Sequence, residues 1–292
     1  MATQPSDLET RVGPRIEFRG DPFASRLSNF PWWFLGIILI AVWAVYIIST
    51  RDNYQEAYAF IKQGIPVTIY ITLVAFSLAS IIGLVAGLSR ISRNVILRNL
   101  GTFYIEVIRG IPMLVLIFYL ALVAVPSVVD ALNAFGAWLN GVGLGFFGAI
   151  FLAIENKNVP LEVRAIIALA VTYGAFMAEV FRAGIQSIGR GQMEAARSLG
   201  MSNAQSLRYI ILPQAVRNIL PALGNDFVAM VKDSSLVSVL AVRDITQVAR
   251  LYAGRSFRFS EAYTTIAVMY LTMVVILSLL VQFIERRLRA NE

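Results

Sequence analysis

The chain has 292 residues, of which 58% are hydrophobic and only 15% charged, a composition too apolar for a soluble surface and typical of an integral membrane protein. The absence of cysteine and histidine excludes disulfides, thiolate or imidazole metal sites, cysteine nucleophiles and histidine-based triads. The net charge of +7 comes from arginines that gather beside apolar runs, which indicates cytoplasmic loops of a membrane protein and argues against a nucleic-acid partner.

The N-terminal part is predicted to be a cytoplasmic tail followed by a membrane anchor. Residues 1–30 mix arginines with acids, glycine and prolines, and the next apolar run lies too far along the chain for a cleavable signal peptide. Residues 31–50 are free of charge and contain Trp32 and Trp33, which are typical of a membrane interface. We expect one transmembrane helix here that anchors the chain.

Five further spans are expected, because apolar runs of about 20 residues recur along the chain. They cover residues 64–88, 104–125, 161–181, 218–242 and 263–284. The run 218–242 contains Pro221 and Gly224, so we predict a broken helix there. The third of the six spans is expected to end at Pro126. The fold class is therefore all-α, with about six transmembrane helices.

Small residues mark one face of the second span. Ala79, Gly83 and Gly87 recur every four positions, and such a stripe lets another helix approach closely. The alternative is that glycine is simply common in membrane helices. We favour helix packing.

Residues 131–154 are free of charge and long enough to span, but Asn133, Asn140 and a glycine cluster interrupt them. If they crossed the membrane, the arginine-rich segments 90–98 and 182–217 would lie on opposite sides. The positive-inside rule places both in the cytoplasm, so residues 131–160 are predicted to be an extracytoplasmic insertion, interfacial or re-entrant. Both termini are then cytoplasmic. Four arginines disagree with the rule because they fall outside: Arg243, Arg250, Arg255 and Arg258.

The longest internal polar stretch, residues 191–218, reads GQMEAARSLGMSNAQSLRYIILPQAVRN. Its beginning favours a helix, and Gly200 is suited to a left-handed C-cap. Ser202 and Gln205 form an S-x-x-Q capping box that starts a second helix, which Pro213 is expected to end. The pattern predicts two short helices at an angle.

The two short helices present faces suited to a partner. Ala195 and Ala196 give the first a small, smooth face, and Leu207 and Ile210 give the second an apolar one. Such a helical hairpin fits a groove in another protein. The alternative is a pair of amphipathic helices lying on the lipid surface.

This segment resembles the EAA signature of permease subunits of ATP-binding-cassette importers. The matching residues are Glu194, Ala195, Ala196, Gly200, Ile210, Ile211, Leu212 and Pro213. EVIRGIPMLV (106–115), YGAFMAEVFRAGIQSI (173–188) and VKDSSLVSVL (231–240) look like the polar amino acid branch of those permeases. The resemblance covers residues 64–287 and leaves out the N-terminal anchor and the segment 131–154.

The resemblance implies a five-helix importer domain over residues 64–287, with one additional N-terminal helix, in a bacterial inner membrane. It implies an ATPase dimer, a second permease subunit (identical or paralogous) and an extracytoplasmic solute-binding protein as partners, with lipid around the spans. Residues 186–215 would be the cytoplasmic loop that couples the permease to the ATPase. Its residues in that role are Gly191, Glu194, Ala195, Ala196, Gly200, Leu207, Ile210 and Pro213.

ATP hydrolysis is not expected in the chain itself. It has three lysines, and none follows a glycine, so no GxxxxGK[ST] phosphate loop exists. We predict a non-catalytic subunit without a cofactor, a metal or catalytic residues.

Polar residues within spans are the candidates for a solute pathway, since a charge near the bilayer centre costs on the order of 3 kcal/mol. Ser234 and Ser235 are expected to cap a helical piece that attracts a carboxylate. Two alternatives stay open: Lys232 and Asp233 mark the membrane boundary, and Glu179 pairs with Arg182 on its own helix. The candidate pathway residues are Glu179, Asp226, Lys232, Asp233, Ser234 and Ser235.

The predicted function is thus the permease subunit of an ATP-driven importer of polar amino acids. A secondary transporter, or a permease for another small polar solute, is the main alternative. A membrane-embedded enzyme ranks third, because the sequence has no paired-carboxylate motif and lacks histidine and cysteine.

Overall fold

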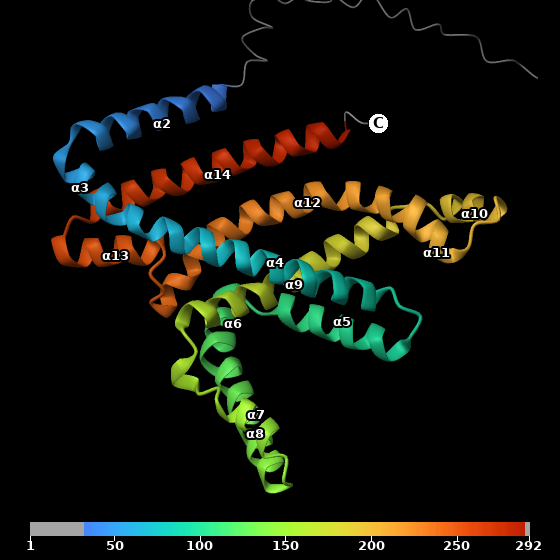
Figure 1. Cartoon of the computed structure of the whole chain (residues 1–292). Helices are drawn as coiled ribbons and strands as arrows, with labels where there is room; N and C mark the ends of the chain where they lie inside the picture. Colours follow the sequence, from blue (N-terminus) through green and yellow to red (C-terminus); the bar gives the residue numbers. More distant parts are fainter. Residues whose placement is uncertain (1–31, 290–292) are drawn as a thin grey trace, which may run out of the picture. The chain divides into compact units, whose positions relative to one another are not determined.

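The structure is a computed structural model that describes residues 32–289, so the predicted tail, residues 1–30, lies outside the described residues. Over this range the regular structure is entirely helical (Figure 1). The longer helices are α2 (Trp32–Thr50), α3 (Asp52–Ile61), α4 (Ile65–Arg90), α5 (Val95–Gly110), α6 (Met113–Tyr119), α7 (Val125–Gly141), α8 (Gly145–Leu152), α9 (Leu161–Gln186), α10 (Arg190–Ser198), α12 (Leu212–Asp233), α13 (Ile245–Ser256) and α14 (Phe259–Arg289).

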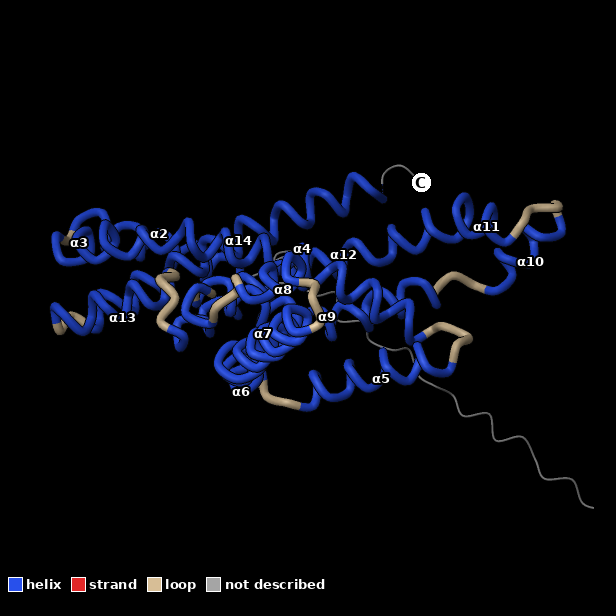
Figure 2. The backbone as a smooth tube through the Cα atoms, turned by 60° about the horizontal axis from the view of Figure 1, so that its bottom comes forward, coloured by secondary structure: helices blue, strands red, loops and turns tan. Residues whose placement is uncertain are grey.

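Short helical pieces connect these helices. Figure 2 shows that most of the connections are brief loops. The short pieces are the 3-10 turns η1 (Lys62–Gly64), η3 (Asn156–Asn158) and η5 (Ser234–Leu240), the π-helical turns η2 (Leu120–Ala124) and η4 (Leu207–Ile211), and α11 (Asn203–Ser206).

The chain divides into two units, Met1–Tyr46 and Ile47–Glu292. Of the first unit the structure describes most of α2, which is an uncharged apolar helix. All helices from α3 onward belong to the second unit.

Four described helical stretches are long and apolar enough to cross a bilayer: Asp52–Arg90, Met113–Gly141, Leu161–Gln186 and Phe259–Arg287. Two other helices fall in regions where the sequence predicted spans: α2 is apolar but shorter, and α12 is more polar. The all-α membrane fold predicted from composition and periodicity is confirmed.

The centre of the second unit is the contact between α4 and α9, the most extensive between any two helices of the described chain. Ala79 is fully buried there. A Cβ on Gly83 would stand 2.7 Å from the Cβ of Met177, and one on Gly87 would stand 2.7 Å from the backbone oxygen of Ala178. The two helices approach this closely because glycine carries no side chain.

The third span differs from its predicted bounds, 104–125. Helix α5 ends at Gly110, and Ile111 and Pro112 are extended before α6 begins. The residue before a proline is pushed out of the helical region by the proline ring, which explains the break. The apolar helix then continues to Gly141, so the predicted start of the insertion at residue 131 lies inside a helix.

Pro126 and Pro213 do not end helices, contrary to expectation. Each follows a π-helical turn by one residue, η2 and η4 respectively. Proline conflicts with the carbonyl of the preceding turn, and a wider π turn relieves that conflict. The carbonyl freed by Pro126 finds another donor, since Arg164 Nη1 lies 3.4 Å from the oxygen of Ala121. Beside Pro213, the side chain of Gln214 donates a 2.8 Å hydrogen bond to the oxygen of Ile210, four residues earlier.

The fifth span, predicted as a broken helix over residues 218–242, is not broken at Pro221 or Gly224, and the α-helix gives way to the 3-10 turn η5 only at Ser234. Helix α12 runs without interruption past Pro221 and Gly224 to Asp233. A Cβ on Gly224 would stand 2.5 Å from Cγ1 of Val281, so this glycine allows α14 to pack closely against α12.

Candidate functional site: a helical hairpin and a polar path between helices

The segment between α9 and α12 folds into the predicted helical hairpin. Helix α10 ends at Ser198, and Gly200 takes a left-handed conformation with φ of +78°. The Ser202 hydroxyl accepts a 3.3 Å hydrogen bond from the backbone N–H of Gln205, whose side-chain oxygen accepts one of 2.9 Å from the N–H of Ser202. The capping box and the left-handed turn are confirmed.

A side-chain bridge stiffens the turn of this hairpin. The Arg197 guanidinium donates two hydrogen bonds, of 3.0 and 2.6 Å, to Oδ1 of Asn203. The backbone N–H of Gly200 also bonds the oxygen of Arg197, at 2.9 Å. These local bonds connect the two helices of the hairpin.

The hairpin presents apolar and acidic groups to its surroundings. Leu199 is 84% exposed, and Glu194, Ala195, Leu207, Gly191 and Pro213 are exposed as well. Ala196 is buried, and Ile210 is partly buried. Glu194 forms no ion pair with any described residue. This surface has the composition of one that a partner covers.

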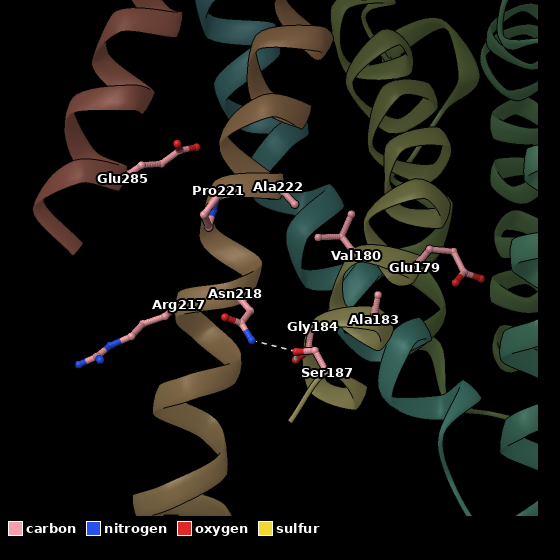
Figure 3. A pocket seen from close by; sticks show the side chains of 10 residues that line it. All are labelled: Glu179, Val180, Ala183, Gly184, Ser187, Arg217, Asn218, Pro221, Ala222 and Glu285. Atoms are coloured by element: carbon pink, nitrogen blue, oxygen red, sulfur yellow. Dashed lines mark hydrogen bonds between the residues drawn. The ribbon is translucent and has the colours of Figure 1, made fainter. Parts of the chain in front are cut away.

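A polar contact ties the hairpin's two flanking helices together. The Asn218 amide of α12 donates a 2.9 Å hydrogen bond to Oγ of Ser187, directly after α9 (Figure 3). The chain segments that enter and leave the hairpin are therefore bonded to each other.

A cavity of about 670 Å³ opens beside this contact, between α9, α12 and α14 (Figure 3). Its walls combine small apolar residues of α9 with polar groups from the C-terminal part of α9 and from α12 and α14. The polar lining residues are Glu179, Ser187, Arg217, Asn218 and Glu285. A cavity of this size with groups of both charges accommodates a small polar solute.

Glu179 lies at the centre of an arginine cluster. Its carboxylate pairs with Arg90 of α4, with Arg182 at 2.7 Å and with Arg109 of α5 at 3.7 Å. Arg90 also reaches Glu106, at 2.9 Å. The expected pair with Arg182 is present, but two distant helices contribute as well. Because its lone pairs are taken up by these arginines, Glu179 has a packing role in this arrangement.

Two carboxylates of α12 lie toward α9. Asp233 accepts a 2.7 Å hydrogen bond from the hydroxyl of Tyr173, which is 4% exposed. Asp226, seven residues earlier on the same helix, has its Oδ2 buried with no hydrogen-bond partner among the described residues. A buried carboxylate oxygen without a donor is costly, so Asp226 marks a place where a donor from outside the chain would bind well.

The other candidates of this region lie apart from the two carboxylates. Lys232 is exposed and forms no ion pair with Asp226. Ser234 is fully buried and donates to the oxygen of Val231 at 2.7 Å. Because α12 runs directly into η5, Ser234 and Ser235 do not cap a new helix, and that part of the prediction is wrong.

Asp244, directly before α13 and distant from the α10–α11 hairpin, is fully buried. Its carboxylate caps α13 by accepting from the N–H groups of Gln247 at 2.9 Å and Thr246 at 3.2 Å. Burial raises its pKa to about 6, and the hydrogen bonds of the cap partly oppose that rise. The next N–H, of Ile245, bonds Oγ1 of Thr68 at 3.1 Å.

Some of these residues had no signal in the sequence pattern. Tyr173 bonds Asp233, 60 positions away, and Arg90 pairs with Glu179, 89 positions away, so a local sequence pattern does not predict either contact. Asp244 followed by a helical segment was a recognisable N-cap pattern. Among residues 32–289, no group of three or more acidic side chains is placed to hold a metal ion.

The family described as binding-protein-dependent transport system inner membrane component matches residues 79–290. The probable glutamine ABC transporter permease protein GlnM of Bacillus subtilis is 33% identical over 238 residues, which are 81% of this chain and 96% of that protein. The glutamine transport system permease protein GlnP of Escherichia coli is 29% identical, over 78% of this chain and 92% of that protein.

A solved structure has the same fold. The crystal structure of an amino acid ABC transporter with histidines contains a chain that superposes with a TM-score of 0.64 at 35% identity. The match covers 78% of the present chain and 94% of the other.

Proposed function

Because the chain belongs to the family of binding-protein-dependent transport system inner membrane components, we propose that it is the permease subunit of an ATP-driven importer of polar amino acids. The observation that carries the substrate class is the similarity to amino acid permeases over almost their whole length. The polar cavity and, outside its lining, the buried carboxylate oxygen of Asp226 that has no donor among the described residues fit solutes with an ammonium group. The chain itself is a multi-pass inner membrane protein.

We propose that the α10–α11 hairpin is the element that couples the permease to ATP hydrolysis by a separate ATPase. Its turn is rigid, its outer surface is exposed, and it connects directly to α9 and α12. Closure of an ATPase dimer would then move the hairpin as a body and shift the two helices that border the cavity. Glu194, Ala195 and Leu207 form the surface that would contact the ATPase.

The proposed topology places both termini and the hairpin in the cytoplasm, and α13 and the segment 131–160 outside. The end of α9 and the charged end of α14 then lie on the hairpin's side. Single cysteines at Ala2, Ser202, Asn156 and Ala290 test this in a chain without native cysteine. An impermeant thiol reagent added to intact cells should label only the variant at position 156. Labelling at position 202 would contradict the topology.

The proposed outer partner is a solute-binding protein with an acidic face. Arg243 and Arg250 on and beside α13 are exposed and form no ion pair with any described residue, and unpaired arginines on the outer side run against the positive-inside rule. On a partner surface rich in carboxylates, these arginines would form ion pairs across the interface. A second permease subunit completes the complex.

The decisive experiment is reconstitution in liposomes with the ATPase and binding protein of the same system. Uptake of a polar amino acid that requires ATP and both partners is the expected result. Uptake driven by an ion gradient without the ATPase would show a secondary transporter instead. Uptake of a different small polar solute, with no amino acid transported, would contradict the substrate class while leaving the ATP coupling in place.

A further inference from the structure

The segment between the third and fourth apolar helices forms a helical hairpin of its own. Helices α7 and α8 lie side by side and project away from the α4–α9 pair (Figure 1). Their backbones touch: a Cβ on Gly136 would stand 2.9 Å from the oxygen of Gly148, and one on Gly148 would stand 2.6 Å from that of Gly136. Two glycines facing each other are the means by which membrane helices pack closely without polar side chains.

The hairpin carries few polar groups, and its large apolar residues lie on the outside. Asn133 is partly buried, with its side-chain oxygen enclosed, whereas Asn140 is exposed, although its Oδ1 lies 2.2 Å from where a Cβ on Gly148 would stand. These are the only polar side chains between residues 131 and 154, and no charge is present. The large residues point outward instead, with these exposed: Phe135 47%, Trp138 59%, Val142 52%, Phe146 78%, Phe147 55% and Ile150 53%.

The base of the hairpin is polar. Asn156 donates a 2.7 Å hydrogen bond to the carboxylate of Asp130, and Glu155 pairs with Lys157 at 2.5 Å. The guanidinium of Arg164 bonds the backbone oxygens of Asn156 and Val159. The charged groups therefore stop at the base of the hairpin, and beyond it the only polar side chains are those of Asn133 and Asn140.

We propose that the α7–α8 hairpin is embedded in the hydrocarbon of the outer half of the bilayer, with its polar base at the extracytoplasmic boundary. The large exposed side chains Phe135, Trp138 and Val142 share one face of α7, whereas those of α8, Phe146, Phe147 and Ile150, lie on more than one face, including the tip. A protein partner covers one face and leaves the others to water, whereas acyl chains cover them all. The enclosed side-chain oxygen of Asn133 has the same explanation, because a polar group facing hydrocarbon is costly.

The test is the accessibility of spin labels on single cysteines in the full-length protein, reconstituted in phosphatidylcholine nanodiscs with its ATPase. Labels are placed by Phe146→Cys at the tip, Ile150→Cys on α8 and Lys157→Cys at the base. Power saturation with oxygen, which concentrates in hydrocarbon, is compared with saturation by a water-soluble nickel chelate. Lys157 is the matched control, since it lies in the same segment and is exposed to water in the proposal.

The expected result is high oxygen and low nickel accessibility at positions 146 and 150, with the reverse at 157. Nickel accessibility at position 146 equal to that at 157 would place the hairpin in water and overturn the proposal. Low accessibility to both reagents would show a protein contact there and overturn it as well. Neither outcome bears on ATP-driven uptake, so the two proposals are tested separately.

Discussion

Tyr173 in the middle of α9 donates a 2.7 Å hydrogen bond to Asp233 at the end of α12. This bond joins the two helices that continue into the α10–α11 hairpin, at a point far from the hairpin itself. Together with the Asn218–Ser187 bond, it holds α9 and α12 at both ends of the stretch that borders the cavity.

Removing the Tyr173 hydroxyl should destabilise the protein. Tyr173→Phe leaves the Asp233 carboxylate without its donor in a partly buried position, which costs about 1–3 kcal/mol. Thermal unfolding in detergent should show a lower Tm than that of the wild type. Tyr70→Phe, at a tyrosine that is 56% exposed, is the control and should melt like the wild type. Equal Tm values for both variants would mean that the bond contributes nothing.

Asp226→Asn keeps the side-chain volume and removes the charge that we place on the solute pathway. The complex should assemble and hydrolyse ATP but lose most uptake, and the loss should be larger for cationic than for anionic amino acids. Uptake assays in liposomes measure this. Asp52→Asn, an exposed acid at the start of α3, serves as control. Failed assembly would instead indicate a packing role, and unchanged uptake of every substrate would exclude contact with the solute.

Glu179→Gln should destabilise the α4–α5–α9 contact by about 3 kcal/mol, because three arginines would be left close together with a single neutral acceptor. The matched variant is Glu106→Gln, whose carboxylate pairs with Arg90 but is 61% exposed; it should cost less than about 1 kcal/mol. Chemical denaturation in detergent compares the two. Adding Arg90→Met to Glu179→Gln should restore part of the loss.

Changes in the α10–α11 hairpin should uncouple transport without unfolding the membrane part. Gly200→Pro is incompatible with the positive φ, and Glu194→Lys inverts a charge on the exposed face. Both variants should insert normally and lose ATP-driven uptake and copurification with the ATPase. Gly189→Ala, at a glycine with open space and no positive φ, should keep both activities. Normal copurification and uptake in the first two variants would remove the coupling role.

Stability should depend on pH through Asp244. Its pKa in the folded protein, about 6, lies above the ordinary value of 3.8, so the folded state holds a proton that the unfolded state releases. This contribution is full below about pH 4 and is lost as the pH rises through 6, and its size is on the order of 3 kcal/mol. Tm measured from pH 4 to 8 should fall more steeply for the wild type than for Asp244→Asn. Parallel pH profiles would contradict the assignment.

The elements that the sequence alone determined are those set by local chemistry. Composition decided the membrane class, because hydrocarbon and water select different side chains at any position. The turn at Gly200 and the capping box of Ser202 and Gln205 were predictable, since their bonds join residues three or four apart. The stripe of Ala79, Gly83 and Gly87 was readable because helix periodicity alone places them on one face.

The tertiary structure decided everything that depends on distant partners. Pro126 and Pro213 stay within helices because π turns precede them, and the carbonyl of Ala121 that Pro126 frees is bonded by Arg164, which is 43 positions away and could not be predicted from the local sequence. Glu179 became the centre of a cluster only when α4 and α5 brought Arg90 and Arg109 to it. A sequence pattern states which residue can form an ion pair or a hydrogen bond, but the packing of helices far apart in the chain decides which partner it meets.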